Sequence, residues 1–211
     1  MTPGSVIAMW TGIGLLVGAA MALIWPRLLV TASSGSLTAR LAALPLTAVA
    51  FGGMAWRFGP QFDLLPCSVL AAVGVGLSLI DLLERRLPSA LVYTGLVLIG
   101  GLLVTSAVLH SKGSDLLRAW VGMAIISGFY LVLALLSEGG LGAGDVKLGG
   151  LLGLALGWLS WSTLITATFL GWLTAALVWL LLKATRRRQD SVPMGPFLLF
   201  GALFTIAVVP M

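Results

Sequence analysis

The chain has 211 residues, of which 59% are hydrophobic and only 9% are charged. A soluble domain carries about 25% charged residues, so this composition excludes a water-exposed surface and predicts an integral membrane protein. The net charge of +5 would suit a nucleic-acid-binding protein, but in a membrane chain excess Lys and Arg mark cytoplasmic loops. We therefore expect the lipid bilayer as a partner and no nucleic acid. The single cysteine, Cys67, excludes an internal disulfide and a cysteine-rich zinc site.

Apolar stretches predict an all-α, polytopic membrane bundle with about eight transmembrane segments. One crossing needs roughly 20 residues. In chain order the stretches lie near residues 5–25, 41–56, 66–83, 88–109, 119–137, 144–159, 161–183 and 195–210. They are continuously apolar and do not alternate, which excludes a β-barrel. The N-terminus lacks the basic residues of a cleaved signal peptide, and we expect residues 1–211 to form a single membrane domain.

Basic residues indicate how the segments are oriented. The sixth and seventh could form one helix, but Gly157–Ser162 contains Trp158 and Trp161 and is typical of an interfacial turn. With eight segments, the basic residues divide nine to three between the two sides of the membrane. The nine are Arg27, Arg40, Arg85, Arg86, Lys147, Lys183, Arg186, Arg187 and Arg188, and the three are Arg57, Lys112 and Arg118. The positive-inside rule then places both termini outside the cytoplasm.

Glycines recur at helical spacing in the first and sixth segments. The first pair is Gly14 and Gly18, and the second group is Gly149, Gly153 and Gly157. Small side chains let helix backbones approach closely in a membrane, so these positions predict tight helix packing.

Most of the seven carboxylates have an ordinary explanation. Three lie in polar stretches between segments, where we expect solvated charges: Asp63, Asp115 and Asp190. Glu84 lies beside Arg85 and Arg86, which predicts an ion pair at a helix end. Glu138 ends the fifth segment before a glycine-rich stretch, where it either joins a functional site or extends to the membrane interface.

Asp81 and Asp145 differ because both lie at membrane depth. Asp81 follows the apolar run Val69–Ile80 and precedes Arg85 by four residues, which places it about 6 Å inside the basic end of its helix. Asp145 begins the sixth segment, directly after Gly139–Gly144. Ionisable groups at this depth are costly and by default face the bundle interior or a wet cavity. The two acids therefore reach the same membrane face at nearly the same depth.

Two carboxylates at one depth suggest an aspartic catalytic pair. Like charges held close cannot both ionise readily, so such a pair shares a proton. One carboxylate can take a proton from water while the other protonates the scissile carbonyl or the leaving amine. The alternative is structural: Asp145 caps its helix, and Asp81 pairs with an arginine one turn on. The residues alone leave both interpretations open.

Three segments carry a resemblance to a known family. Leu79–Pro88 contains Asp81, Gly142–Leu148 reads Gly-Ala-Gly-Asp-Val-Lys-Leu and contains Asp145, and Val192–Phe197 precedes the last segment. In this order they resemble the IDxxxxxIP, GxGDxK and IPFGPF motifs of the type IV prepilin peptidases, a family of membrane aspartic proteases. The resemblance covers about residues 66–211, with a fainter echo at Gly14–Gly18.

The resemblance implies that Asp81 and Asp145 are the catalytic pair and that no metal or cofactor takes part. Lys147 would shape the site, although an interface anchor explains it equally well. The implied substrate is a prepilin or pseudopilin with a short basic leader, which is cut just before the hydrophobic helix of the substrate. The implied location of the cut is the cytoplasmic face of a bacterial or archaeal inner (plasma) membrane.

One departure from the family concerns methylation. Large members carry a cytoplasmic domain with a four-cysteine zinc site after the first span, associated with methylating the new N-terminus. Here that position holds only residues 26–40. We therefore expect a short, peptidase-only form that does not depend on S-adenosylmethionine.

Two other functions are compatible with paired acids. A presenilin-like or signal-peptide-peptidase-like protease shares the GxGD motif, but it usually has a PAL-type sequence near its last spans, which is absent here. A transporter could use the acids as a proton relay, yet such residues commonly lie near mid-membrane at internal-repeat interfaces. No repeat is visible in this sequence.

Overall fold

Eight α-helices make up almost all of the computed structural model, which describes residues 2–28, 36–136, 142–184 and 193–209. The helices are α1 (Pro3–Leu28), α2 (Ser36–Phe58), α3 (Leu64–Glu84), α4 (Ser89–His110), α5 (Gly113–Leu136), α6 (Ala143–Leu159), α7 (Trp161–Ala184) and α8 (Gly195–Val208). Each apolar segment expected from the sequence corresponds to one helix. Ser160 has an extended backbone and separates α6 from α7, so the turn expected at this place is confirmed.

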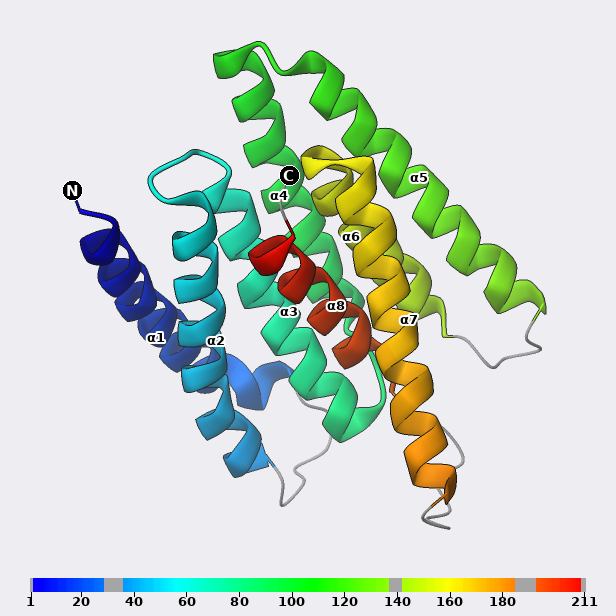
Figure 1. The fold of residues 1–211 in the computed structure, drawn as a ribbon. Coiled ribbons are helices and arrows are strands. Elements are labelled where there is room, and N and C mark those ends of the chain that lie inside the picture. The colour runs from blue at the N-terminus through cyan, green and yellow to red at the C-terminus, as the bar shows by residue number, and fades with distance from the viewer. Residues whose placement is uncertain (1, 29–35, 137–141, 185–192, 210–211) are drawn as a thin grey trace.

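The helices alternate in direction (Figure 1). The C-terminal end of α3 and the N-terminal ends of α6 and α8 lie at one end of the bundle, called here the motif end. Both described chain ends lie at the opposite, far end. Asp81 and Asp145 thus lie at the same end of the bundle, as expected from their depth. Which end faces the cytoplasm stays a prediction from the charges.

Six helices are long and apolar enough to cross a membrane: α1, α2, α3, α4, α5 and α7. The other two are shorter, with 17 residues in α6 and 14 in α8. At 1.5 Å per residue they span about 25 and 21 Å, less than the roughly 30 Å of the hydrocarbon core. The number of crossings expected from the sequence, about eight, therefore stays a prediction for these two helices.

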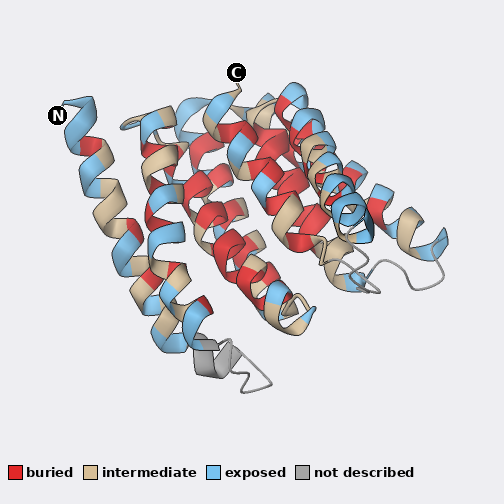
Figure 2. Ribbon diagram, turned by 60° about the horizontal axis from the view of Figure 1, so that its bottom comes forward, coloured by how far each residue is buried: buried red, intermediate tan, exposed pale blue. Residues whose placement is uncertain are grey.

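Buried residues concentrate on α3 and α6 in the interior of the bundle (Figure 2). Helix α6 packs closely against α5 because its glycines leave no side chain in the way. A Cβ at Gly153 would lie 2.5 Å from the carbonyl oxygen of Gly122, and one at Gly14 would lie 2.8 Å from that of Thr47 in α2. The close helix packing predicted from glycine spacing is confirmed for both helix pairs.

The far end corrects the expectation that Asp63 is a solvated charge, whereas Asp115 remains partly exposed in an ion pair. Asp63 accepts hydrogen bonds from Lys112 Nζ at 3.2 Å and from Trp158 Nε1 at 3.0 Å. Asp115 lies in the first turn of α5 and pairs with Arg118 at 3.0 Å. Short connections bring these groups together at the helix ends.

Trp158 is only 3% exposed, so it does not lie at the lipid surface as an interfacial turn residue would.

Arg86 pairs with Glu84, which confirms the ion pair expected at the motif end. Asp190 lies outside the described residues.

Candidate active site

Asp81 lies one turn before the end of α3 and is 6% exposed. Its carboxylate oxygen Oδ2 accepts a 2.9 Å hydrogen bond from the backbone N–H of Gly195, the first residue of α8. The first N–H groups of a helix have no partner within the helix, so they are available to an acceptor. Helix α3 ends just beyond, where Arg85 adopts a left-handed backbone (φ 50°) and its N–H bonds to Asp81 O. Pro88 then prevents the helix from continuing.

Asp145 lies in the first turn of α6, and its Oδ2 accepts a 3.2 Å hydrogen bond from the N–H of Gly142. A carboxylate three residues after the N-cap that reaches back to it is one half of a capping box. The structural alternative considered for this residue is thus realised in part: Asp145 does cap its helix. A capping bond to one oxygen is compatible with chemistry at the same carboxylate, because the group has several acceptor sites.

Asp81 and Asp145 are close enough for the charge of one to act on the other. Leu87, which follows α3, packs against the starts of α6 and α8. A Cβ at Gly195 would lie 2.7 Å from Asp81 Oδ2 and 3.4 Å from Leu87 Cδ2, and a Cβ at Gly144 would lie 2.9 Å from Leu87 Cβ. Glycine at these two positions therefore allows α6 and α8 to approach Leu87 and the carboxylates.

Lys147 connects the start of α6 with the start of α4. Its Nζ donates a 2.7 Å hydrogen bond to Ser89 Oγ and lies 5.4 Å from the ring centre of Tyr93. This contact fixes the position of α6 two residues after Asp145. Lys147 is thus an anchor between two helices at the site.

Tyr130 belongs to α5 and packs against α6. It is 1% exposed, its ring packs against Gly149, and its hydroxyl accepts a 3.0 Å hydrogen bond from Trp172 Nε1. The charge of the Asp145 carboxylate interacts electrostatically with the Tyr130 hydroxyl. The buried Tyr130 therefore joins the surroundings of Asp145 to α7.

Sequence reasoning did not find Leu87, Tyr130 or the role of Gly195. Gly195 lies in the third motif segment, so the motif was a signal that this position meets the acids. Leu87 lies in the first motif segment, which is a signal of the same kind. Tyr130 is an aromatic residue within an apolar segment, and nothing in its spacing distinguishes it.

Several residues considered in the sequence analysis lie away from the two acids or outside the described residues. Glu138 and the loop glycines Gly139 and Gly140 lie outside the described residues, as do Arg186–Arg188. Within the described ranges, no group of three His, Cys, Asp or Glu side chains could hold a metal ion. Cys67 is buried in α3. His110 ends α4 at the far end, where its ring centre lies 5.7 Å from that of Phe62.

Comparison with known proteins agrees with the motifs. Residues 68–210 match the type IV leader peptidase family. A prepilin leader peptidase/N-methyltransferase from Pseudomonas putida is 34% identical over 151 residues, which make up 69% of this chain and 50% of the relative. The chain thus spans about half the length of this curated relative. No solved structure matches it. The three motif segments and the match over residues 68–210 show that this helical membrane protein belongs to the type IV leader peptidase family.

Proposed function

We propose that the protein is an aspartic endopeptidase whose catalytic pair is Asp81 and Asp145. The observation that supports this most is their geometry. The two carboxylates come from different helices, lie at one end of the bundle, and are close enough to interact electrostatically. Each is oriented by a backbone N–H of a motif glycine, Gly195 for Asp81 and Gly142 for Asp145.

In the proposed reaction the pair adds water across a peptide bond. One carboxylate takes a proton from the water while the oxygen of the water attacks the scissile carbonyl carbon. The other carboxyl group donates a proton to the leaving amine. The C–N bond breaks, which leaves a new carboxyl group and a new amine. Because the two acids share one proton, each supplies one of the two roles. The hydrogen bonds from Gly142 and Gly195 fix the direction of the carboxylates before the substrate binds, which lowers the barrier by positioning.

The proposed substrate is a prepilin or pseudopilin precursor whose short basic leader meets the membrane at the motif end. Membership of the family supports this, as does the printed name of the Pseudomonas putida relative. The charge distribution supports a motif end on the cytoplasmic side of the inner membrane. We expect no methyl transfer, because only residues 29–35 join α1 to α2 and one cysteine cannot form a four-cysteine site.

Cleavage of a co-expressed prepilin, followed by gel mobility, tests the proposal. Asp81→Asn and Asp145→Asn each keep the shape of the side chain and an acceptor oxygen but remove the acid. We expect each to reduce cleavage by about 10²–10⁴-fold. Asp115→Asn is the matched control, because this acid lies at the far end in an ion pair of the kind worth about 0–1 kcal/mol. Normal cleavage by either site variant, at normal membrane levels, contradicts the catalytic pair.

A further inference from the structure

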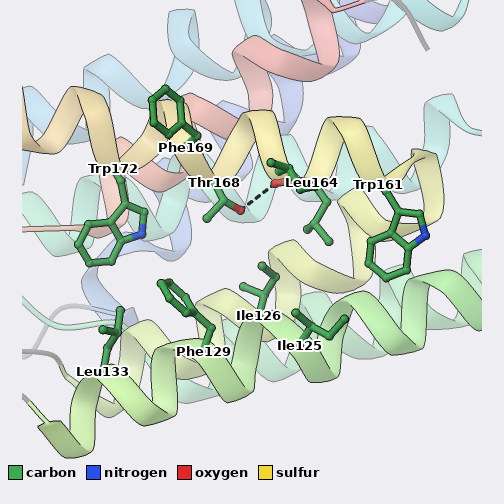
Figure 3. A pocket seen from close by; sticks show the side chains of 10 residues that line it. Ile125, Ile126, Phe129, Leu133, Trp161, Leu164, Thr168, Phe169 and Trp172 are labelled. Carbon is green, nitrogen blue, oxygen red and sulfur yellow. Dashed lines mark hydrogen bonds between the residues drawn. The ribbon is translucent and has the colours of Figure 1, made fainter.

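An apolar groove runs between α5 and α7 (Figure 3). It has a volume of about 670 Å³, and the described residues that line it all belong to these two helices. Ile126 and Leu164 are buried at its base, whereas Ile125, Phe129 and Trp161 along its sides are exposed. Both helices pack on α6. The outer surface of the bundle is therefore hollowed at this place.

The apolar lining of the groove favours an apolar occupant over a polar one. Its one aliphatic hydroxyl, Thr168 Oγ1, already donates a 2.8 Å hydrogen bond to the Leu164 carbonyl within α7 (Figure 3). Within a membrane, an occupant must be apolar outside and must satisfy its own backbone polar groups. A transmembrane helix meets both requirements, because its N–H and C=O groups bond within the helix.

One end of the groove lies next to the candidate active site. Trp172, which lines the groove, donates a hydrogen bond to Tyr130, and the two rings stack with centres 6.2 Å apart. Tyr130 in turn packs against Gly149, one helical turn after Asp145, and lies within the influence of its charge. The ring of Tyr130 and about one turn of α6 thus separate this end of the groove from Asp145.

The groove then runs along the bundle away from Asp145. Its lining extends along α7 from Trp172 to Trp161, which is the first residue of this helix at the far end. These eleven steps correspond to about 16 Å, or roughly three turns of a second helix lying alongside. The direction matches a peptide chain that leaves the active site and enters the membrane as a helix.

We infer that this groove binds the apolar helix that follows the scissile bond in the substrate. The inference rests on the proposed function, since it assumes that the chain is cut near Asp145. Apolar side chains on one face of that helix, spaced by three or four residues, would pack between Phe129 and Trp172 and farther along the groove, as in other helix-in-groove interfaces. A lipid acyl chain is the competing occupant, and the experiment separates the two.

Photo-crosslinking in lipid nanodiscs tests which molecule occupies the groove. Benzoylphenylalanine replaces Phe129 in the Asp145→Asn protein, so that binding is read without cleavage. The probe is a labelled peptide with a basic leader, a cleavage site and a 20-residue apolar helix. The control places the photoreactive residue at Leu16 on α1, an exposed position (72%) on a helix that packs on α2 and α3. We expect at least fivefold more peptide crosslinking at position 129. Equal labelling, or crosslinks at 129 only to phospholipid, overturns the inference.

A kinetic comparison in the enzyme with both acids intact gives a second readout. Ile125→Trp narrows the groove, while Val97→Trp adds the same bulk to an exposed position on α4. Two peptides are compared: the one with the apolar helix and a short one that ends a few residues after the cleavage site. We expect Ile125→Trp, but not Val97→Trp, to lower the ratio of kcat/KM for the long over the short peptide at least fivefold. An unchanged ratio contradicts the groove.

The two proposals fail in different ways. If neither peptide is cut by the unsubstituted protein while position 129 still captures the long peptide, the proposed peptidase activity is wrong, and the groove binds an apolar helix without a link to cleavage. If both peptides are cut and position 129 captures neither, the groove inference is wrong and the catalytic pair stands.

Discussion

The N–H of Gly195 donates a 2.9 Å hydrogen bond to the carboxylate of Asp81, across 114 residues of sequence. The contact joins the first and third motif segments directly. It requires a residue without a side chain, because a Cβ at Gly195 would lie 2.7 Å from the bonded oxygen. The third motif therefore contributes a specific atom to the candidate site, in addition to starting the last helix.

Gly195→Ala is expected to impair cleavage by displacing the Asp81 carboxylate. A misplacement of about 1 Å at a catalytic group can cost about 10²-fold in rate. The rate of prepilin processing in isolated membranes measures the effect. Gly101→Ala is the control, since a Cβ there has no neighbour within 4 Å. Equal processing by the two variants would show that the position of Asp81 does not depend on Gly195.

The double variant Asp81→Asn/Asp145→Asn is expected to be no slower than either single variant. Residues that act as one catalytic unit are strongly non-additive, because loss of either partner already removes the shared reaction path. The residual rates of all three variants, measured with a long incubation, check this. A double variant slower by the product of the two single effects would indicate independent roles.

Lys147→Ala and Ser89→Ala are expected to lose the same interaction. The 2.7 Å bond from Lys147 Nζ to Ser89 Oγ predicts a coupling of about 0.5–1.5 kcal/mol in a double-mutant cycle. The cycle is measured on kcat/KM for cleavage, and Ser162→Ala at the far-end start of α7 is the control partner. Additive effects of the Lys147 and Ser89 changes would mean that the contact does not position α6.

Gly153→Val is expected to destabilise the bundle, because the new side chain would collide with the α5 backbone at Gly122. Overpacking of this kind costs about 1–3 kcal/mol. Thermal unfolding in detergent measures the loss. Gly128→Val serves for comparison, since that position in α5 has open space for a Cβ. A similar Tm for both variants would contradict the close approach of α5 and α6.

Trp158→Phe is expected to lower stability while leaving the motif end intact. The change removes the hydrogen bond to Asp63, worth about 1 kcal/mol, from a nearly buried ring at the far end. Trp161→Phe is the matched comparison, because its ring is 43% exposed. If the two variants unfold at the same temperature, the bond between Trp158 and Asp63 does not stabilise the bundle.

Long apolar runs made the helices predictable from sequence, whereas helix ends depended on polar contacts. Helix α5 begins at Gly113 and not near residue 119, and its start contains an ion pair between Asp115 in the first turn and Arg118 in the next. Arg118 also bonds the carbonyls at the end of α6, including Gly157 O at 2.7 Å. Such partners come from distant segments, so a scan for apolar runs does not find them.

The candidate site was predictable only where charge or glycine marked a residue. Asp81 and Asp145 are recognisable because acids are rare at membrane depth. Leu87 lies in the first motif segment but is neither charged nor glycine, and only the fold shows that it packs between Gly144 and Gly195. The error for Asp63 is of the opposite kind. Its carboxylate was expected to be solvated, but the fold places two hydrogen-bond donors, Lys112 and Trp158, beside it.

The order of the elements along the chain has a consequence for biosynthesis. Asp81 and Asp145 enter the membrane with α3 and α6, but the donor to Asp81 arrives with Gly195 at the start of α8, later in the chain than both acids. Domains form from the N-terminus onward during synthesis. A nascent chain would therefore hold Asp81 without this donor until α8 docks, whereas Gly142 reaches Asp145 within the start of α6 itself. Under the proposed function, the catalytic pair would be complete only once α8 is in place.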